Sequence, residues 1–115
     1  MKITREHYRE FIGTLCNDIK ELQEELACIE QSEDGCEYEE TRELVVRYKK
    51  MFAYFMEMEW EEFDDIKFLD GHVKLVEYNY RLATKYSLER EKDELFDQLI
   101  AWSTFHEFCK YGMIL

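Results

Sequence analysis

Two short acidic segments are the part of this sequence whose residue types and spacing are best suited to chemistry. Glu39-Glu40-Thr41-Arg42-Glu43 has the form EExxE. Glu61-Glu62-Phe63-Asp64-Asp65 contains the pattern ExxD twice. Carboxylate oxygens are the ligands that a hard cation such as Mg²⁺ prefers, so a metal site is the first chemistry to consider.

The EExxE and ExxD patterns resemble the metal-binding motifs of the all-α nucleoside triphosphate pyrophosphatases, the MazG-like family. The resemblance covers these two short segments and the predicted number of helices. It implies a magnesium-dependent pyrophosphohydrolase in which the metal bridges to the substrate phosphates. Such an enzyme would need the side chains of five residues to converge on the metal: Glu39, Glu40, Glu43, Glu62 and Asp65.

The predicted directions of these carboxylates argue against a metal site. At about 100° per residue, the helix face that contains Val45 and Phe52 is the core face of the second predicted helix. Glu39 and Glu43 then point nearly opposite to it, and Glu40 points sideways. Because a metal site in a helical bundle needs carboxylates that project inward, we expect no metal and no cofactor, and the enzyme remains the alternative hypothesis.

Other catalytic patterns are weaker. The sequence contains no GxSxG elbow, no P-loop and no dinucleotide-binding fingerprint. His106 and Cys109 lie three residues apart on one predicted helix, but a pair among aromatic residues is more typical of packing than of a catalytic triad. No two cysteines have CxxC spacing, which predicts free thiols and no zinc site. The cysteines are Cys16, Cys28, Cys36 and Cys109.

The negative charge of the chain is concentrated. The net charge of the 115 residues is −12. Segments 30–43 and 57–70 each hold seven acidic residues and one basic residue, so each contributes −6 and together they account for the total. Direct binding to nucleic acid is excluded on this ground, because phosphates would be repelled. A basic protein surface would be attracted.

The elements that must position these acids are helices, since proline is absent and there are only four glycines. An apolar stripe from Tyr8 to Ile29 predicts a first long helix that Thr4 caps. Ser32-Glu33-Asp34-Gly35 is typical of a turn, and a second stripe predicts a helix over 37–59. The short connection makes the two helices an antiparallel hairpin. Residues 60–69 either extend the second helix or form a separate turn.

The second half of the chain also predicts two helices. Asp70-Gly71 is typical of a turn, and residues 72–86 carry two apolar stripes, which predicts the most buried helix of the domain. Ser87 is positioned to cap a last helix, and Gly112 fits the position just beyond its end. We therefore expect a single helical domain over 1–115. Its predicted fold class is all-α, a compact bundle of about four helices that begins with a long antiparallel helical hairpin.

The chain has more aromatic residues on its helices than one small core can bury, Tyr54, Tyr78 and Tyr86 among them. Exposed aromatic clusters beside acidic patches are typical of protein–protein interfaces. A partner protein and a homodimer seam both remain open. No apolar run reaches the ~20 residues of a membrane span, and the first residues lack the apolar run of a signal peptide, so we expect no membrane contact and a cytoplasmic location.

The function we expect is that of a non-enzymatic, acidic protein-binding module. A helix over 37–59 has 23 residues and spans about 35 Å, which would place the two acidic segments one turn of duplex DNA apart, ~34–36 Å. The chain could therefore act as an inhibitor or DNA mimic on a basic surface of a nucleic-acid-handling protein. It is similar in general character to small acidic phage proteins that inhibit host defence nucleases. The expected partner-binding residues are Glu33, Asp34, Glu37, Glu39, Glu40, Glu57, Glu59, Glu61, Glu62, Asp64, Asp65 and Asp70.

Overall fold

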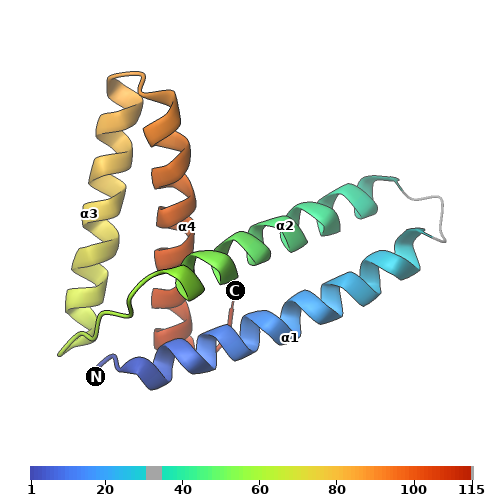
Figure 1. Cartoon of the computed structure of the whole chain (residues 1–115), viewed down its shortest axis with the longest axis horizontal. Helices are drawn as coiled ribbons and strands as arrows, with labels where there is room; N and C mark the ends of the chain where they lie inside the picture. Colours follow the sequence, from blue (N-terminus) through green and yellow to red (C-terminus); the bar gives the residue numbers. More distant parts are fainter. Residues whose placement is uncertain (31–34, 115) are drawn as a thin grey trace.

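Two antiparallel helical hairpins build the fold in the computed structural model, which describes residues 1–30 and 35–114. Helices α1 (Arg5–Glu30) and α2 (Gly35–Glu57) form the first hairpin, and α3 (Ile66–Lys85) and α4 (Glu89–Tyr111) form the second (Figure 1). The hairpins meet near the start of α1 and diverge from there like the two arms of an L. The predicted all-α fold of four helices beginning with a long antiparallel hairpin is confirmed.

The core lies where the hairpins meet, and aromatic rings dominate it. Tyr8 and Phe11 of α1, Phe55 of α2 and Phe105 of α4 are fully buried. The Tyr8 and Phe105 rings stack with their centroids 4.4 Å apart, and the Phe11 ring meets the Phe55 ring edge-on at 5.4 Å. Each such pair stabilises the fold by about 0.5–1.5 kcal/mol beyond the contribution of its buried area. Helix α4 belongs to both halves, because it contacts α3, α2 and α1.

The predicted end of the last helix is confirmed. Gly112 lies just beyond α4 in the left-handed conformation, with φ at +75°, and its N–H donates to the carbonyl oxygen of Phe108 at 2.8 Å. Thr4 directly precedes α1, and its hydroxyl oxygen lies 3.3 Å from Nδ1 of His7. Ser87 does not cap α4: the position before the helix is Leu88, which makes no side-chain cap hydrogen bond.

The turn predicted at Asp70-Gly71 is wrong, because both residues lie inside α3. Asp65 caps α3 at its start, so the helix is already established when the chain reaches Gly71. Residues 58–65 are not helical, so they do not extend α2, which ends at Glu57. Residues 32–34 of the turn predicted at 32–35 lie outside the described residues.

The prediction that residues 72–86 form the most buried helix is also wrong. Of the described helices, only α4 contacts α3. One stripe of α3 is buried against it, including Val76 and Ala83, while Leu75 and Tyr78 of the other stripe are exposed. The chain itself therefore covers one of the two apolar stripes and leaves residues of the other exposed. None of the described helices has the length and apolar character needed to cross a membrane.

Candidate functional site

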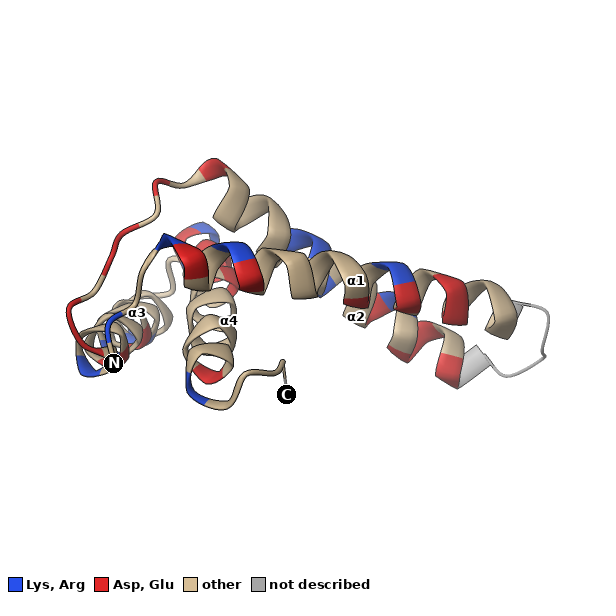
Figure 2. Ribbon diagram, turned by 90° about the horizontal axis from the view of Figure 1, so that it is seen from below, with Lys and Arg blue, Asp and Glu red and all other residues tan. Residues whose placement is uncertain are grey.

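The segment that links the two hairpins, residues 58–65, is named here the acidic strap. It runs without helical structure along one side of the molecule and carries a row of acidic residues (Figure 2). Its apolar members face inward: Phe63 is buried and Trp60 is half-buried. Its exposed members are acids, Glu59, Glu61 and Glu62 among them. The alternation of buried ring and exposed carboxylate fixes which side of the strap faces the solvent.

Three contacts hold the backbone of the strap. Nε1 of Trp60 donates to the carbonyl oxygen of Phe55 at 2.6 Å. The hydroxyl of Tyr8 donates to the carbonyl oxygen of Glu61, and its ring stacks on Trp60 with the centroids 5.5 Å apart. Phe63 and Ile3 exchange two backbone hydrogen bonds, of 2.8 and 2.9 Å. The acids of the strap are therefore presented on a backbone that the core itself fixes.

The carboxylates presented in this way form no ion pair within the described part of the chain. Among the residues that the structure describes, no lysine or arginine forms an ion pair with the acids of segment 57–64, which are Glu57, Glu59, Glu61, Glu62 and Asp64. Burial raises the pKa of Tyr8, and Cys109, Glu61 and Glu62 raise it further. Tyr8 thus stays protonated and keeps donating to the strap.

Asp65 and Asp70, two predicted partner-binding acids at the start of α3, have contacts within the fold. Oδ1 of Asp65 accepts a hydrogen bond from the backbone N–H of Lys67 at 3.1 Å, which caps α3 and lowers the pKa of Asp65. Asp70 lies 3.0 Å from Nζ of Lys74 and 3.9 Å from Nε2 of His106. The contact with Lys74 lowers the pKa of Asp70. Both side chains position α3 in addition to any role at the surface.

The first acidic segment lies at the other end of α2. Glu37, Glu39 and Glu40 are exposed on its first turns, and Glu39 lies 3.9 Å from Arg42. Glu33 and Asp34 lie outside the described residues. The 23 residues of α2 span about 35 Å, so this group and the acidic strap are held apart by one rigid helix.

The convergence that a metal-dependent enzyme requires is not seen. Within residues 1–30 and 35–114, no group of three or more His, Cys, Asp or Glu side chains is arranged to hold a metal ion. The EExxE segment and the ExxD segment lie near opposite ends of α2. Cys109 gives no nucleophile either, since burial, helped by Glu10, raises the pKa of its thiol to about 12.

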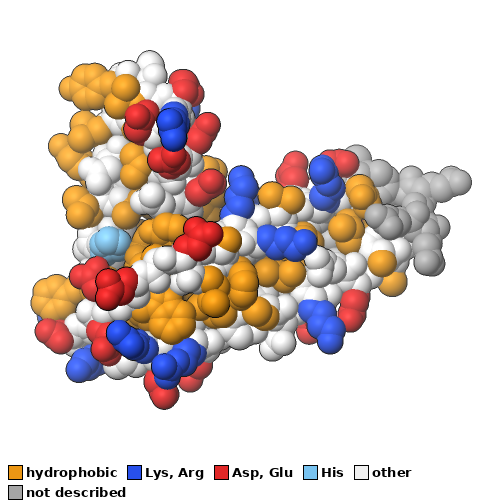
Figure 3. Space-filling model, viewed as in Figure 1, with side chains coloured by type: hydrophobic (Ala, Val, Ile, Leu, Met, Phe, Trp, Pro, Cys, Tyr) orange, Lys and Arg blue, Asp and Glu red, His pale blue; other side chains and the backbone are white. Residues whose placement is uncertain are grey.

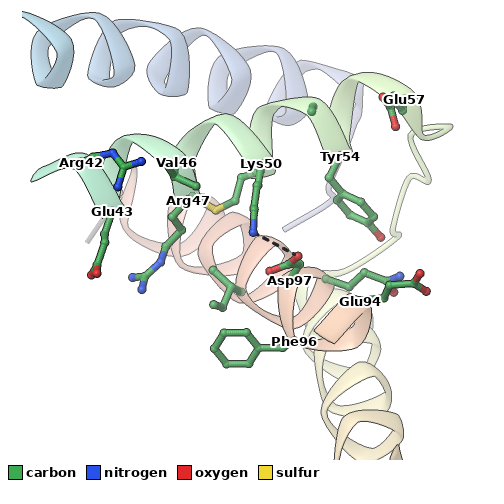
Figure 4. A pocket seen from close by; sticks show the side chains of 14 residues that line it. Arg42, Glu43, Val46, Arg47, Lys50, Tyr54, Glu57, Glu94, Phe96 and Asp97 are labelled. Carbon is green, nitrogen blue, oxygen red and sulfur yellow. Dashed lines mark ion pairs between the residues drawn. The ribbon is translucent and has the colours of Figure 1, made fainter. Parts of the chain in front are cut away.

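The structure also contains a groove that the sequence did not predict. It has a volume of about 770 Å³ and lies between α2 and α4, where the two arms diverge (Figures 3 and 4). Arg42, Arg47 and Lys50 line its α2 side, and Nζ of Lys50 lies 3.9 Å from Asp97 of α4. Helical spacing places Arg47 and Lys50 on one face of α2, but the angle between the hairpins, which creates the groove, leaves no local pattern in the sequence.

Comparisons of this chain with models of protein families, with curated proteins and with solved structures find no match.

Proposed function

We propose that this chain is a non-enzymatic protein-binding module whose acidic surface engages a basic surface of a partner protein. The observation that carries the proposal is the acidic strap. Its acids Glu59, Glu61, Glu62 and Asp64 are exposed and form no ion pair within the described part of the chain. They stand on a backbone anchored by Tyr8, Trp60 and Phe63. Adjacent like charges raise the free energy of the folded chain and give nothing to its core, so a binding role is the reason to keep them.

The partner is a nucleic-acid-handling protein, and the chain acts on it as a DNA mimic. The two acidic groups lie near the opposite ends of α2, whose 23 residues span about 35 Å, close to the ~34–36 Å of one turn of duplex DNA. A dimeric protein that binds two half-sites one helical turn apart presents cations at that repeat, so both acidic groups could be engaged together. Inhibition follows because the same basic surface cannot hold DNA at the same time. A cytoplasmic anti-defence inhibitor is one protein of this kind.

The alternative, a magnesium-dependent pyrophosphohydrolase, has no comparable support. Its five motif carboxylates would have to surround one ion, and in the described residues they are divided between the two ends of α2.

The experiment that tests the proposal is affinity capture with the tagged chain from the lysate of its native host, washed at low and then at high salt. We expect a basic nucleic-acid-binding protein that is retained at low salt and released at high salt, because exposed charge pairs are screened. The matched bait is the variant E59Q/E61Q/E62Q/D64N, which keeps the buried anchors and removes the charges. We expect it to lose the partner.

A captured protein that binds wild type and variant equally, or that has no affinity for nucleic acid, would contradict the proposal. So would the absence of any salt-sensitive partner. Hydrolysis of nucleoside triphosphates by the chain in Mg²⁺, abolished by Glu40→Gln, would establish the alternative instead.

A further inference from the structure

The side of α3 that faces away from α4 carries an exposed apolar stripe, defined here as Phe68, Leu75, Tyr78, Leu82 and Tyr86. Phe68, Leu75, Tyr78 and Tyr86 are each 55–63% exposed. At about 100° per residue the stripe occupies an arc of roughly 80°, and the centre of this arc lies about 100–140° from the buried Leu69, Val76 and Ala83. Figure 3 shows hydrophobic side chains gathered along this outer edge of the second arm. A continuous apolar stripe of this length is typical of an interaction surface.

A glycine lies inside the stripe. Gly71 occupies the same arc as Leu75 and Leu82, and a Cβ added to it would meet nothing within 4 Å. A glycine in the interior of a helix destabilises it by about 1 kcal/mol relative to alanine, and no contact within the chain requires one here. A gap between Phe68 and Leu75 would, however, admit a large side chain from a helix packed against α3.

The charges beside the stripe are one-sided. A basic ridge, defined here as Lys67, Lys74, Arg81 and Lys85, follows one edge of the stripe. The other edge carries the uncharged Asn79 and His72. The two acids of α3 lie beyond the ridge: Asp70 pairs with Lys74 and Glu77 pairs with Arg81. Four cations and two acids give α3 a net charge of +2 in a chain of −12.

This charge pattern decides between the possible occupants. In an antiparallel pairing of two copies, the basic ridge of each α3 would face the basic ridge of the other and repel it. In a parallel pairing, each ridge would face the uncharged Asn79 edge and find no counter-charge. An anionic membrane would find cations along one edge of the stripe only. A helix with acids along one edge and uncharged residues along the other matches both the basic ridge and the uncharged Asn79 edge of the stripe.

We propose that the outer face of α3 is a docking site for a partner protein's amphipathic helix, which carries an apolar stripe and an acidic edge. The apolar stripe supplies the buried area, Gly71 receives a large side chain, and the basic ridge fixes the direction of the bound helix. This face is separate from the acidic strap, so the inference does not depend on the proposed function. The chain would then hold a basic partner on one surface and an acidic helix on another.

The test is a selection from a displayed library of helical peptides with a constant apolar stripe, in which the positions beside the stripe vary among Glu, Gln and Lys. With the full chain as bait, we expect Glu to exceed Lys by at least about tenfold along one edge only. Synthetic peptides from the selection are then titrated by fluorescence anisotropy. Leu75→Gln is expected to weaken their binding about tenfold or more, because it removes an apolar side chain that the bound peptide would cover. Leu44→Gln, a change of an exposed leucine on α2, is the matched control and should leave binding unchanged.

A second variant separates binding from folding. Gly71→Gln should raise the melting temperature, since it replaces a helical glycine in open space, and should still weaken binding by filling the gap. Peptides enriched in Lys, or with no preference at either edge, would overturn the proposal. Binding that is unaffected by Leu75→Gln would also overturn it. A dimer of the chain, or binding to anionic vesicles, that is lost in Leu75→Gln would assign the face to a second copy or to lipid instead.

Discussion

Neutralising the acidic strap should stabilise the chain. The variant E59Q/E61Q/E62Q/D64N removes four exposed carboxylates and leaves the buried Phe63 and the half-buried Trp60 in place. Each of these carboxylates lies within two residues of another, and no cation in the described residues forms an ion pair with them. In a fold selected only for stability such a row of charges would be unfavourable.

The size of the effect follows from the spacing. Two unit charges about 7 Å apart repel by about 0.6 kcal/mol in water, and screening at 0.1 M salt reduces this to about 0.3 kcal/mol. Glu59, Glu61, Glu62 and Asp64 include three such close pairs, so the variant should gain up to roughly 1 kcal/mol of unfolding free energy, the part of this repulsion that unfolding relieves. For a chain of this length that is a rise of about 4 °C in Tm.

Thermal unfolding followed by circular dichroism at low and at high salt measures this gain. We expect the difference from wild type to be largest at low salt and to shrink near 1 M salt, where the Debye length is about 3 Å. The control is E89Q/E91Q, which removes two acids from the first turn of α4. It should lower stability by about 0.3–1 kcal/mol per residue, because acids stabilise the start of a helix. A strap variant that is less stable than wild type would refute the reasoning, since its acids would then contribute to the fold.

Three further predictions concern the fold. Tyr8→Phe removes the hydrogen bond to the carbonyl oxygen of Glu61 and should cost about 1–3 kcal/mol in a urea titration, whereas an unchanged midpoint would mean that the bond does not hold the strap. Gly71→Ala should stabilise the chain by about 1 kcal/mol, and Gly112→Ala, at a φ of +75°, should destabilise it by a similar amount. Melting temperatures that change in the same direction for both variants would contradict this reasoning about backbone conformation. Unfolded Cys109 and Tyr8 lose their protons at a pH of about 9 and about 10, and burial raises both values in the folded chain. Stability should thus fall as the pH rises from about 9 to about 12, and a flat profile over that range would count against the burial of both groups.

Local patterns predict the first hairpin and the end of α4 well. The stripe from Tyr8 to Ile29 and the glycine at 112 are signals contained in the helices themselves, so they do not depend on the tertiary fold. The turn expected at Asp70-Gly71 failed because the stronger signal lies earlier, where Asp65 caps α3. A helix with a capped N-terminus and a packed face tolerates a glycine in its interior.

The candidate sites depend on contacts between distant segments. The acids of the strap are evident in the sequence, but their presentation relies on Tyr8 and Ile3, more than fifty residues away. The second stripe of α3 was visible as periodicity and was assigned to the core, because periodicity cannot say which face finds a neighbour within the chain. The α2–α4 groove results from the angle between the hairpins, which no single helix encodes.

The measurement that tests the central proposal most directly is competition with DNA for the captured partner. A labelled duplex of about 20 base pairs, two helical turns, is bound to that partner, and its fluorescence anisotropy is followed during addition of the chain. We predict that the wild-type chain displaces the duplex and that E59Q/E61Q/E62Q/D64N does so at least about tenfold less effectively, with the difference shrinking as salt is raised. A complex in which the partner holds the duplex and the chain together would contradict the proposal, because the acidic surface would then not occupy the DNA-binding site.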